Sequence, residues 1–540
     1  MINNPVTNVE ASGFYQGYNR GIAVSVKVII VLLVLWAATA PNAGDTLLAL
    51  QAATIEYFRG WYIGTTTVFM ALCVLLALLP QTGGQRLGTA GTEPEFGRFA
   101  WFSMMFGAGI GVGMLTYSTA EPLYHFGNNP DVIMGNAEAL ASNNVPYAYK
   151  WTLLHYGLTP WGCYAVVGLS LAYFAYRRGL PLTIRSPFSA LLGNRAGRVS
   201  GALVDTAAIL ATIIGIGVTL GYGVNQFAYG VQRITGWDWI IVADRPTLLA
   251  LALAVLVIVS ASMTSALSGL GRGIKWLSNV NMTLSWLLLA IFVVFGATQF
   301  AAMVFVEGLS EYLTALPAMS STVWSATDTP EAAALSRWQA DWTIFYWAWW
   351  IAFTPFVGLF LARVSRGRTI REYVVGAVIM PSLMCYLWFC IVGGTALDLE
   401  LSGLAEGKIL GADLSAQLFA SLDALFQKPW VFPMACLCVV LLLTYLITSA
   451  DSAVLVINTI ASGGQEDNHN PQHIILWSIL LGLVIITLLV AGGMDALRSV
   501  MIIGALPFSA VMAFMMAALL VAIWRDRQDI QQPQSAATKK

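Results

Sequence analysis

The chain has 540 residues, of which 58% are hydrophobic and only 10% are charged, and its formal net charge at pH 7 is −1. A typical soluble domain carries roughly 25% charged residues, so this composition excludes an ordinary soluble protein, which would expose large apolar patches. The small net charge gives no reason to expect a nucleic-acid partner. The six cysteines are scattered without a CxxC pair, and we interpret them as small buried hydrophobic residues.

Twelve apolar runs are each long enough to cross a lipid bilayer, which takes about 20 residues of helix. Because lipid cannot satisfy free backbone groups, runs this long and apolar predict helices. The sequence therefore predicts an all-α membrane protein with twelve transmembrane helices. In chain order the predicted spans are residues 23–40, 61–79, 99–120, 151–174, 205–232, 246–266, 276–300, 342–364, 372–396, 430–450, 474–493 and 498–524.

The third and eighth predicted spans contain residues that interrupt helices. The third holds four alternating glycines from Gly107 to Gly113, and the eighth holds Pro355. After the first two spans, the other ten divide into two groups of five, and a short interfacial helix is expected at residues 269–278. This layout predicts two inverted five-helix repeats, with a binding site beside the interrupted helices at the bilayer midplane. Close helix packing through small residues is the alternative explanation for the glycines.

The placement of lysine and arginine predicts the orientation, because the cytoplasmic loops of membrane proteins carry an excess of both. Two loops, 177–198 and 363–371, are rich in arginine, and with both termini in the cytoplasm they lie inside with most of the 27 basic residues. We therefore expect a multi-pass protein of a bacterial inner membrane, in contact with its lipids. The predicted parts are a cytoplasmic N-terminal segment (1–22), two peripheral helices (23–98), two inverted repeats (99–303 and 304–524) and a short cytoplasmic tail (525–540).

An enzyme is not expected. No HExxH, GxSxG or GxxxxGK[ST] motif occurs, and the four histidines lack the spacing of a metal site. Acidic residues in or near a membrane are functional candidates by default, and Glu121 and Asp451 lie near span ends. We interpret both as structural, with Glu121 capping a helix end and Asp451 tying loops together.

Aromatic residues concentrate in the fourth and eighth predicted spans. Trp161 and Tyr164 share one helix face, as do Trp347 and Trp350. Aromatic faces attract cations, and boxes of several rings recognise quaternary ammonium groups. The alternatives are an aromatic belt at the membrane interface and plain packing.

Four segments, 107–126, 155–186, 341–372 and 448–453, closely resemble the betaine/carnitine/choline transporter (BCCT) family. The resemblance covers nearly the whole chain after residue 50. It implies a homotrimeric secondary symporter that holds a trimethylammonium group among rings of spans four and eight. Two departures stand out, because Tyr156 and Phe353 occupy positions where betaine carriers usually have tryptophan. By motif position the rings are Tyr156, Trp161, Tyr164 and Trp350, with Trp347 beside the pathway.

The resemblance also implies that Gly109, Gly111 and Gly113 bind the substrate carboxylate through backbone N–H groups, as the ends of broken helices do. Family members that prefer choline carry Asp where this chain has Gly113. Choline is a net cation that gains from a nearby carboxylate, whereas a zwitterion carries its own. No acidic residue occurs between Phe106 and Ala120. We therefore expect a methylated zwitterion such as glycine betaine, with dimethylsulfoniopropionate, carnitine and choline as alternatives.

Sodium-coupled relatives build one ion site from carbonyls of the broken third span and two hydroxyls of span ten. By resemblance, the carbonyls here are those of Gly107, Ala108 and Ile110, and the hydroxyls are those of Thr448 and Ser449. Sodium prefers such hard oxygen ligands. Ordinary hydrogen bonding of both hydroxyls to their own helix is the alternative.

A second sodium site in betaine carriers uses two threonines one turn apart on span five. This chain has Thr212 but Ile216, so we expect that site to be weak or absent. Sodium-independent exchangers place an arginine in this span, and none occurs in residues 205–232. We therefore expect import driven by a sodium gradient, without a cofactor. The alternatives are a proton as the coupling ion, and a membrane sensor that binds the ligand without moving it.

Overall fold

The computed structural model describes residues 9–537 except 90, 108–110, 270–274, 327–328 and 466–469. The described part is almost wholly helical, with one antiparallel β-ribbon of two-residue strands. Ten helical segments within it are long and apolar enough to cross a membrane. The prediction of an all-α membrane fold is therefore confirmed.

The first half of the chain contains α1 (Arg20–Thr39), α2 (Ala43–Leu78), α3 (Pro80–Gly83), α4 (Arg98–Gly107), α5 (Val112–Gly127), α6 (Pro130–Ile133), η1 (Ser142–Asn144), α7 (Val145–Tyr156), α8 (Leu158–Ala172), η2 (Tyr173–Arg177), α9 (Ser186–Thr235), β1 (Ile241–Val242), β2 (Arg245–Pro246), α10 (Leu248–Ser268), α11 (Lys275–Phe295) and α12 (Thr298–Ser321). The second half contains α13 (Pro330–Gln339), η4 (Ala340–Ile344), α14 (Phe345–Val364), α15 (Ile370–Val374), η5 (Val375–Ile379), α16 (Met380–Trp388), η6 (Phe389–Gly393), α17 (Gly394–Leu401), α18 (Gln417–Leu425), α19 (Val431–Ala461) and α20 (Pro471–Ala537).

All twelve predicted runs lie on helices, but several differ from simple spans. The fourth is divided between α7 and α8 at Gly157, and the seventh extends from α11 into α12. The third run is divided between α4 and α5, on either side of the glycine-rich stretch. The eleventh and twelfth runs lie together on α20, which bends at Gly492 and Gly493, where Gly493 adopts a left-handed backbone (φ 65°). The exact number of spans stays a prediction, and the interfacial helix expected at 269–278 lies largely outside the described residues.

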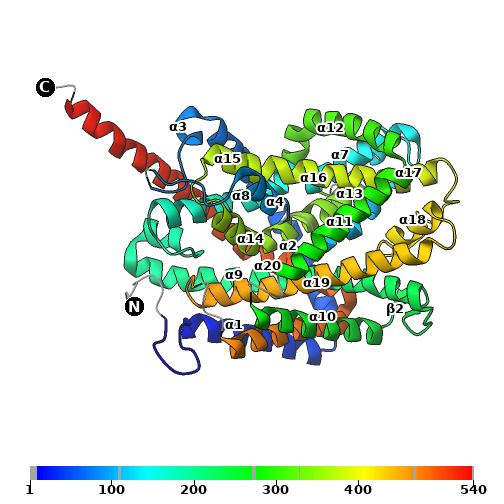
Figure 1. Cartoon of the computed structure of the whole chain (residues 1–540), viewed down its shortest axis with the longest axis horizontal. Helices are drawn as coiled ribbons and strands as arrows, with labels where there is room; N and C mark the ends of the chain where they lie inside the picture. The colour runs from blue at the N-terminus through cyan, green and yellow to red at the C-terminus, as the bar shows by residue number, and fades with distance from the viewer. Residues whose placement is uncertain are drawn as a thin grey trace.

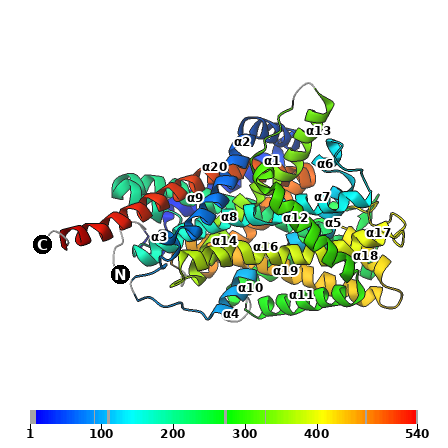
Figure 2. The same ribbon diagram turned by 90° about the horizontal axis from the view of Figure 1, so that it is seen from above.

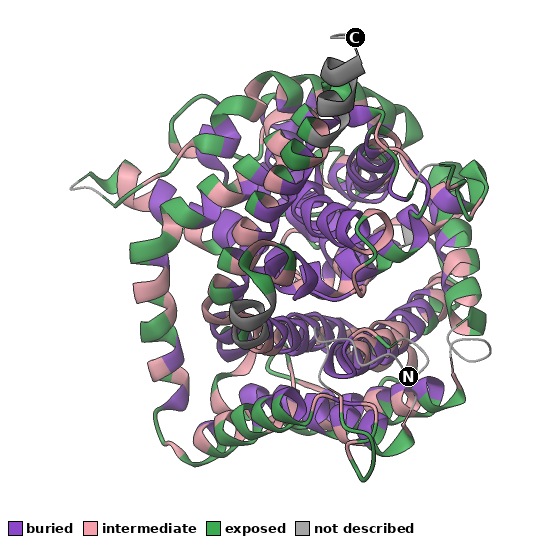
Figure 3. Cartoon of the chain, turned by 90° about the vertical axis from the view of Figure 1, so that its left-hand side faces the viewer, coloured by how far each residue is buried: buried purple, intermediate pink, exposed green. Residues whose placement is uncertain are grey.

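The helices differ strongly in how far they are buried (Figure 3). The most apolar stretch of α7–α8 is 89% buried and that of α13–α14 is 83% buried, against 28% for α11 and 33% for α1. Exposed valine, leucine and phenylalanine side chains on α1, α10 and α11 would face lipid rather than water, given so apolar a chain. The buried helices α5, α7, α8 and α14 therefore form the inner part of the molecule, where polar groups are shielded from lipid.

The two arginine-rich loops lie at the same end of the molecule. The Arg366 guanidinium lies 5.9 Å from the centre of the ring of Tyr176, which directly precedes the other loop. Asp526 on α20 forms ion pairs with Arg177 and Arg178, at 3.0 and 2.5 Å. Beyond these contacts the C-terminal end of α20 projects from the body of the molecule (Figures 1 and 2).

Candidate functional site

A cavity of about 690 Å³ lies among α5, α9, α11, α14 and α19. Its lining follows α14 from Tyr346 to Arg363, which corresponds to about 25 Å of helix at 1.5 Å per residue. The end at Arg363 and Thr459 lies towards the arginine-rich loops. The opposite end is lined by Tyr346, Tyr156 and the first residues of α5.

The break between α4 and α5 places a helix N-terminus in the cavity wall. Gly111 precedes α5 with an extended backbone (φ −163°) and no side-chain cap, and it lines the cavity together with Gly113. The first N–H groups of a helix lack partners within the helix and carry partial positive charge, which suits a carboxylate. A Cβ atom at Gly113 would lie 3.5 Å from the Trp349 ring and 3.7 Å from the Tyr156 hydroxyl. The third predicted glycine, Gly109, lies outside the described residues.

Four aromatic rings predicted to act together do lie together. The Trp350 ring is 4.8 Å from Tyr164, 5.2 Å from Trp161 and 6.0 Å from Tyr156, measured between ring centres. The packing is tilted or edge-to-face throughout. Tyr156, Tyr164 and Trp350 line the cavity, so part of this cluster is open to a ligand.

Trp161 and Trp347 do not line the cavity. Trp161 is completely buried behind Tyr164 and donates a hydrogen bond from Nε1 to the Tyr156 carbonyl at 3.2 Å. It therefore supports the ring cluster from behind. Trp347 is also buried, and its ring meets His155 edge-on at 6.0 Å. This places Trp347 on the face of α14 that points away from the cavity.

Five aromatic residues that line the cavity were not singled out from the sequence, and they are Tyr346, Trp349, Phe356, Phe360 and Tyr445. Trp349 donates from Nε1 to the Thr219 hydroxyl at 2.9 Å and stacks on Tyr222. Tyr346 lies one helical turn before Trp350 on α14 and also lines the cavity. On α14, Tyr346, Trp349, Trp350 and Phe353 are spaced three or four residues apart and so share one helix face, but this spacing alone does not say that the face points into the cavity.

The predicted sodium ligands are only partly described. Thr448 and Ser449 line the cavity on α19. The Thr448 hydroxyl donates to the Thr444 carbonyl at 3.0 Å and accepts from Asn281 Nδ2 at 2.8 Å. The Oδ1 atom of Asn281 is buried and has no hydrogen-bond partner among the described residues. Gly107 is the last residue of α4, whereas Ala108 and Ile110 lie outside the described residues.

Thr212 is separate from the cavity. It is buried on α9 and its hydroxyl donates to the Ala208 carbonyl at 2.8 Å, within its own helix. The neighbouring Ile216 is also buried and offers no oxygen. Two turns further along α9, Thr219 does line the cavity.

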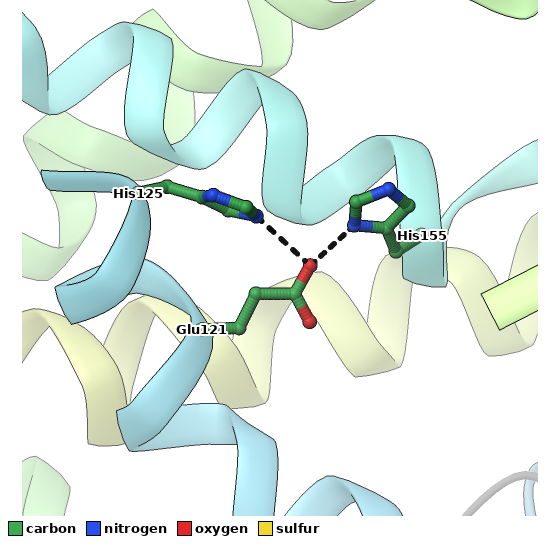
Figure 4. A group of neighbouring side chains, drawn as sticks. All are labelled: Glu121, His125 and His155. Atoms are coloured by element: carbon green, nitrogen blue, oxygen red, sulfur yellow. Dashed lines mark hydrogen bonds and ion pairs between the residues drawn. The ribbon is translucent and has the colours of Figure 1, made fainter. Parts of the chain in front are cut away.

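Glu121 does not cap a helix, so that expectation is wrong. It lies well inside α5, and its Oε1 atom is 2.6 Å from His155 Nδ1 and 3.3 Å from His125 Nε2 (Figure 4). Its Oε2 atom accepts a hydrogen bond from the Tyr346 hydroxyl at 2.5 Å. The spacing of Glu121 and His125, one helical turn apart, is visible in the sequence, but the approach of His155 depends on the packing of α7.

Comparisons with known proteins agree on one group of transporters. A family model described as "BCCT, betaine/carnitine/choline family transporter" matches residues 22–528. The chain is 34% identical over 523 residues to the glycine betaine transporter OpuD of Bacillus subtilis, which covers 95% of this chain and 98% of that one. It is 37% identical over 467 residues to the osmo-dependent choline transporter BetT2 of Acinetobacter baylyi, covering 86% and 65% of the two chains. It is 34% identical over 534 residues to glycine betaine transporter 1 of Vibrio parahaemolyticus, covering 98% and 95%.

Proposed function

The chain belongs to the BCCT family of betaine, carnitine and choline transporters, and we propose that it imports a methylated-ammonium zwitterion such as glycine betaine. It acts as a secondary active symporter driven by a sodium gradient. It works as a homotrimer in a bacterial inner membrane with both termini in the cytoplasm. In that orientation the end of the cavity at Arg363 opens inwards, as the positions of the arginine-rich loops support.

The observation that carries this proposal is the position of Tyr156, which contacts both the helix N-terminus proposed to bind the carboxylate and the aromatic rings proposed to bind the ammonium group. The Tyr156 hydroxyl donates to the Gly113 carbonyl at 3.4 Å, and the Tyr156 ring meets Trp350 edge-on at 6.0 Å. The helix N-terminus at Gly111 and Gly113 suits a carboxylate, while Trp350 and Tyr164 present aromatic faces to a quaternary ammonium group. A small zwitterion can therefore reach both sites at once.

The charge of the cavity supports a zwitterion over choline. Among the described residues that line it, Arg363 is the single charged side chain, and it lies at the far end from Gly113. A bound choline would have no carboxylate to balance its charge, whereas glycine betaine balances its own.

Sodium coupling is supported by the oxygen atoms on α19 and α11. Thr448 and Ser449 place two hydroxyls on the cavity wall. Asn281 donates a hydrogen bond from Nδ2 to the Thr448 hydroxyl, and its other side-chain atom, Oδ1, has no hydrogen-bond partner among the described residues. Hydroxyl and amide oxygens are hard ligands of the kind sodium prefers.

The experiment is uptake of labelled glycine betaine into proteoliposomes that contain the purified protein, with and without an inward sodium gradient. Accumulation that depends on the gradient is expected. Binding without accumulation would favour a membrane sensor, and accumulation indifferent to sodium would refute the sodium coupling. Competition by unlabelled choline, carnitine and dimethylsulfoniopropionate tests the identity of the substrate. If one of these compounds competes better than unlabelled glycine betaine, that compound becomes the proposed substrate.

A further inference from the structure

The cluster of Glu121, His125 and His155 has no part in the function proposed above. All three side chains are completely buried. Glu121 and His125 lie on α5 and His155 lies on α7 (Figure 4). With Tyr346 of α14, which donates a hydrogen bond to Glu121, the cluster joins three helices. Aromatic rings enclose it, with Trp342 at 4.7 Å from His125 and Tyr346 stacked on His155 at 4.7 Å.

The cluster lacks a permanent positive charge. Among the described residues, the two histidines are the only ion-pair partners of Glu121. An ionised Glu121 beside two neutral histidines would leave one uncompensated negative charge in a dry, aromatic setting, which is a costly arrangement. One added proton, on the carboxylate or on an imidazole, removes that charge.

The charged groups on neighbouring elements are engaged elsewhere. Lys150 of α7 pairs with Asp131 of α6 at 2.7 Å, and Arg498 of α20 pairs with Asp341 of η4 at 3.2 Å. Other titratable groups on elements packed against α5, or near the cluster, include Tyr117 and Tyr124 on α5 itself, Tyr147, Tyr149 and Tyr156 on α7, Asp205, Tyr222, Tyr229 and Arg233 on α9, Tyr346 on α14, Cys390 on η6, Asp398 and Glu400 on α17, Asp423 on α18, and Cys436, Cys438, Tyr445 and Asp451 on α19.

The spacing of the cluster fits a proton better than a metal ion. The 2.6 Å between Glu121 Oε1 and His155 Nδ1 is a hydrogen-bond distance. Two tetrahedral ligands of one zinc ion, each at 2.0–2.1 Å from it, would lie about 3.3 Å apart. The second carboxylate oxygen is already engaged by the Tyr346 hydroxyl.

Two tyrosines connect the cluster with the cavity. The Tyr346 hydroxyl, which donates to Glu121, lies 3.4 Å from the Tyr156 hydroxyl. The Tyr156 hydroxyl in turn lies 3.4 Å from the carbonyl oxygen of Gly113, a residue of the helix N-terminus whose N–H groups are proposed to bind the substrate carboxylate. A negative charge on Glu121 would repel that carboxylate, whereas a neutral cluster would not.

We propose that Glu121, His125 and His155 form a proton-binding site, and that a proton occupies it when the zwitterionic substrate occupies the cavity. The proton comes from solvent, is shared between Glu121 Oε1 and His155 Nδ1, and returns to solvent after the substrate leaves. This inference rests on the proposed function, because it needs a substrate carboxylate near Gly113. Linkage is reciprocal, so the substrate binds more tightly when the site is protonated, and the protein takes up protons when the substrate binds.

The test is isothermal titration calorimetry of glycine betaine on the purified protein, at constant saturating sodium, in two buffers with different ionisation enthalpies. For the wild type we expect proton uptake on binding, and an affinity about fivefold or more higher near pH 5.5 than near pH 8.5. Glu121→Gln keeps the size and hydrogen bonds of a neutral carboxyl group. It should bind with the high affinity at both pH values and take up no proton, whereas the control Glu331→Gln, at the exposed start of α13, should behave as the wild type.

Each other outcome has one meaning. A wild-type affinity that is independent of pH, or a Glu121→Gln variant with the wild-type pH dependence, would overturn the proton site. If Glu121→Gln fails to fold, the two-buffer measurement on the wild type alone decides the question. If elemental analysis finds one zinc ion per purified chain, the cluster is a metal site and the proposed proton site is refuted. Absence of glycine betaine binding at every pH would refute the proposed substrate instead.

Discussion

Trp350 is the residue on which the proposed ammonium site depends, because its ring contacts Tyr156, Trp161 and Tyr164 and also lines the cavity. Trp350→Leu removes the largest aromatic face. A desolvated cation–π contact contributes about 2 kcal/mol, so glycine betaine should bind roughly thirtyfold more weakly or not measurably. Equilibrium binding to the purified variant measures this loss.

The matched control for Trp350→Leu is Trp276→Leu, since Trp276 is 65% exposed on the outer face of α11. The control should bind glycine betaine as the wild type does. Unchanged affinity in a folded Trp350→Leu protein would refute the assignment of the aromatic box.

In our interpretation, the absence of a carboxylate at Gly113 makes the protein select a zwitterionic substrate over the cation choline. Gly113→Asp places a carboxylate beside Tyr156 and Trp349, and the nearest contacts of the new Cβ, 3.5 and 3.7 Å, are ordinary van der Waals distances. The variant should therefore fold and gain choline uptake, measured in proteoliposomes. Gly113→Asn has the same size without the charge and should not transport choline. Equal choline uptake by both variants, or by neither, would remove the electrostatic explanation.

At the scale of single helices, α19 carries the proposed sodium site. Thr448→Ala and Ser449→Ala each remove one oxygen ligand from a charged ion, so the sodium concentration for half-maximal uptake should rise about tenfold or more. Thr444→Ala is the control, because Thr444 lies one turn away and does not line the cavity, and its hydroxyl donates to the Val440 and Leu441 carbonyls of its own helix. A sodium dependence in Ser449→Ala equal to that of Thr444→Ala would contradict the site.

The helices also show which contacts the sequence reveals. Trp161 and Tyr164 are three residues apart on α8, so their common face follows from helical periodicity alone. Trp347 was expected beside the pathway by motif position, yet it points away from the cavity, because its neighbour Tyr346 occupies the inner face. Which face of α14 points inwards depends on its packing against α8, and no pattern within the run of aromatic residues from Trp342 to Trp350 fixes it.

Long-range packing explains the part of the site that the sequence could not predict. The glycines from Gly107 to Gly113 predicted a break, and α4 and α5 are separate helices there. In contrast, His155 reaches Glu121 only because α7 packs against α5, although 34 residues separate them. Apolar length and helix-breaking residues are local properties and are readable from sequence, whereas a cluster assembled from α5, α7 and α14 is not.

At the scale of the whole molecule, the cavity and the membrane give a further prediction about access. In the proposed orientation, the end of the cavity at Thr459 faces the cytoplasm, and Glu138, which is exposed after α6, faces outwards. A membrane-impermeant maleimide should therefore label Thr459→Cys from the inside and Glu138→Cys from the outside. Five native cysteines are buried and Cys436 is half-buried, so a Cys436→Ser background keeps unspecific labelling low.

Inside-out and right-side-out vesicles make the comparison direct, because the two variants should exchange their labelling when the membrane is inverted. Saturating glycine betaine should slow labelling of Thr459→Cys, since the substrate shares the cavity, and leave Glu138→Cys unchanged as the control. Labelling of both positions from one side would contradict the orientation that the arginine-rich loops predict. If Thr459→Cys is labelled only from the outside, the protein has the opposite orientation in the membrane. The Thr459 end of the cavity and the arginine-rich loops would then face away from the cytoplasm.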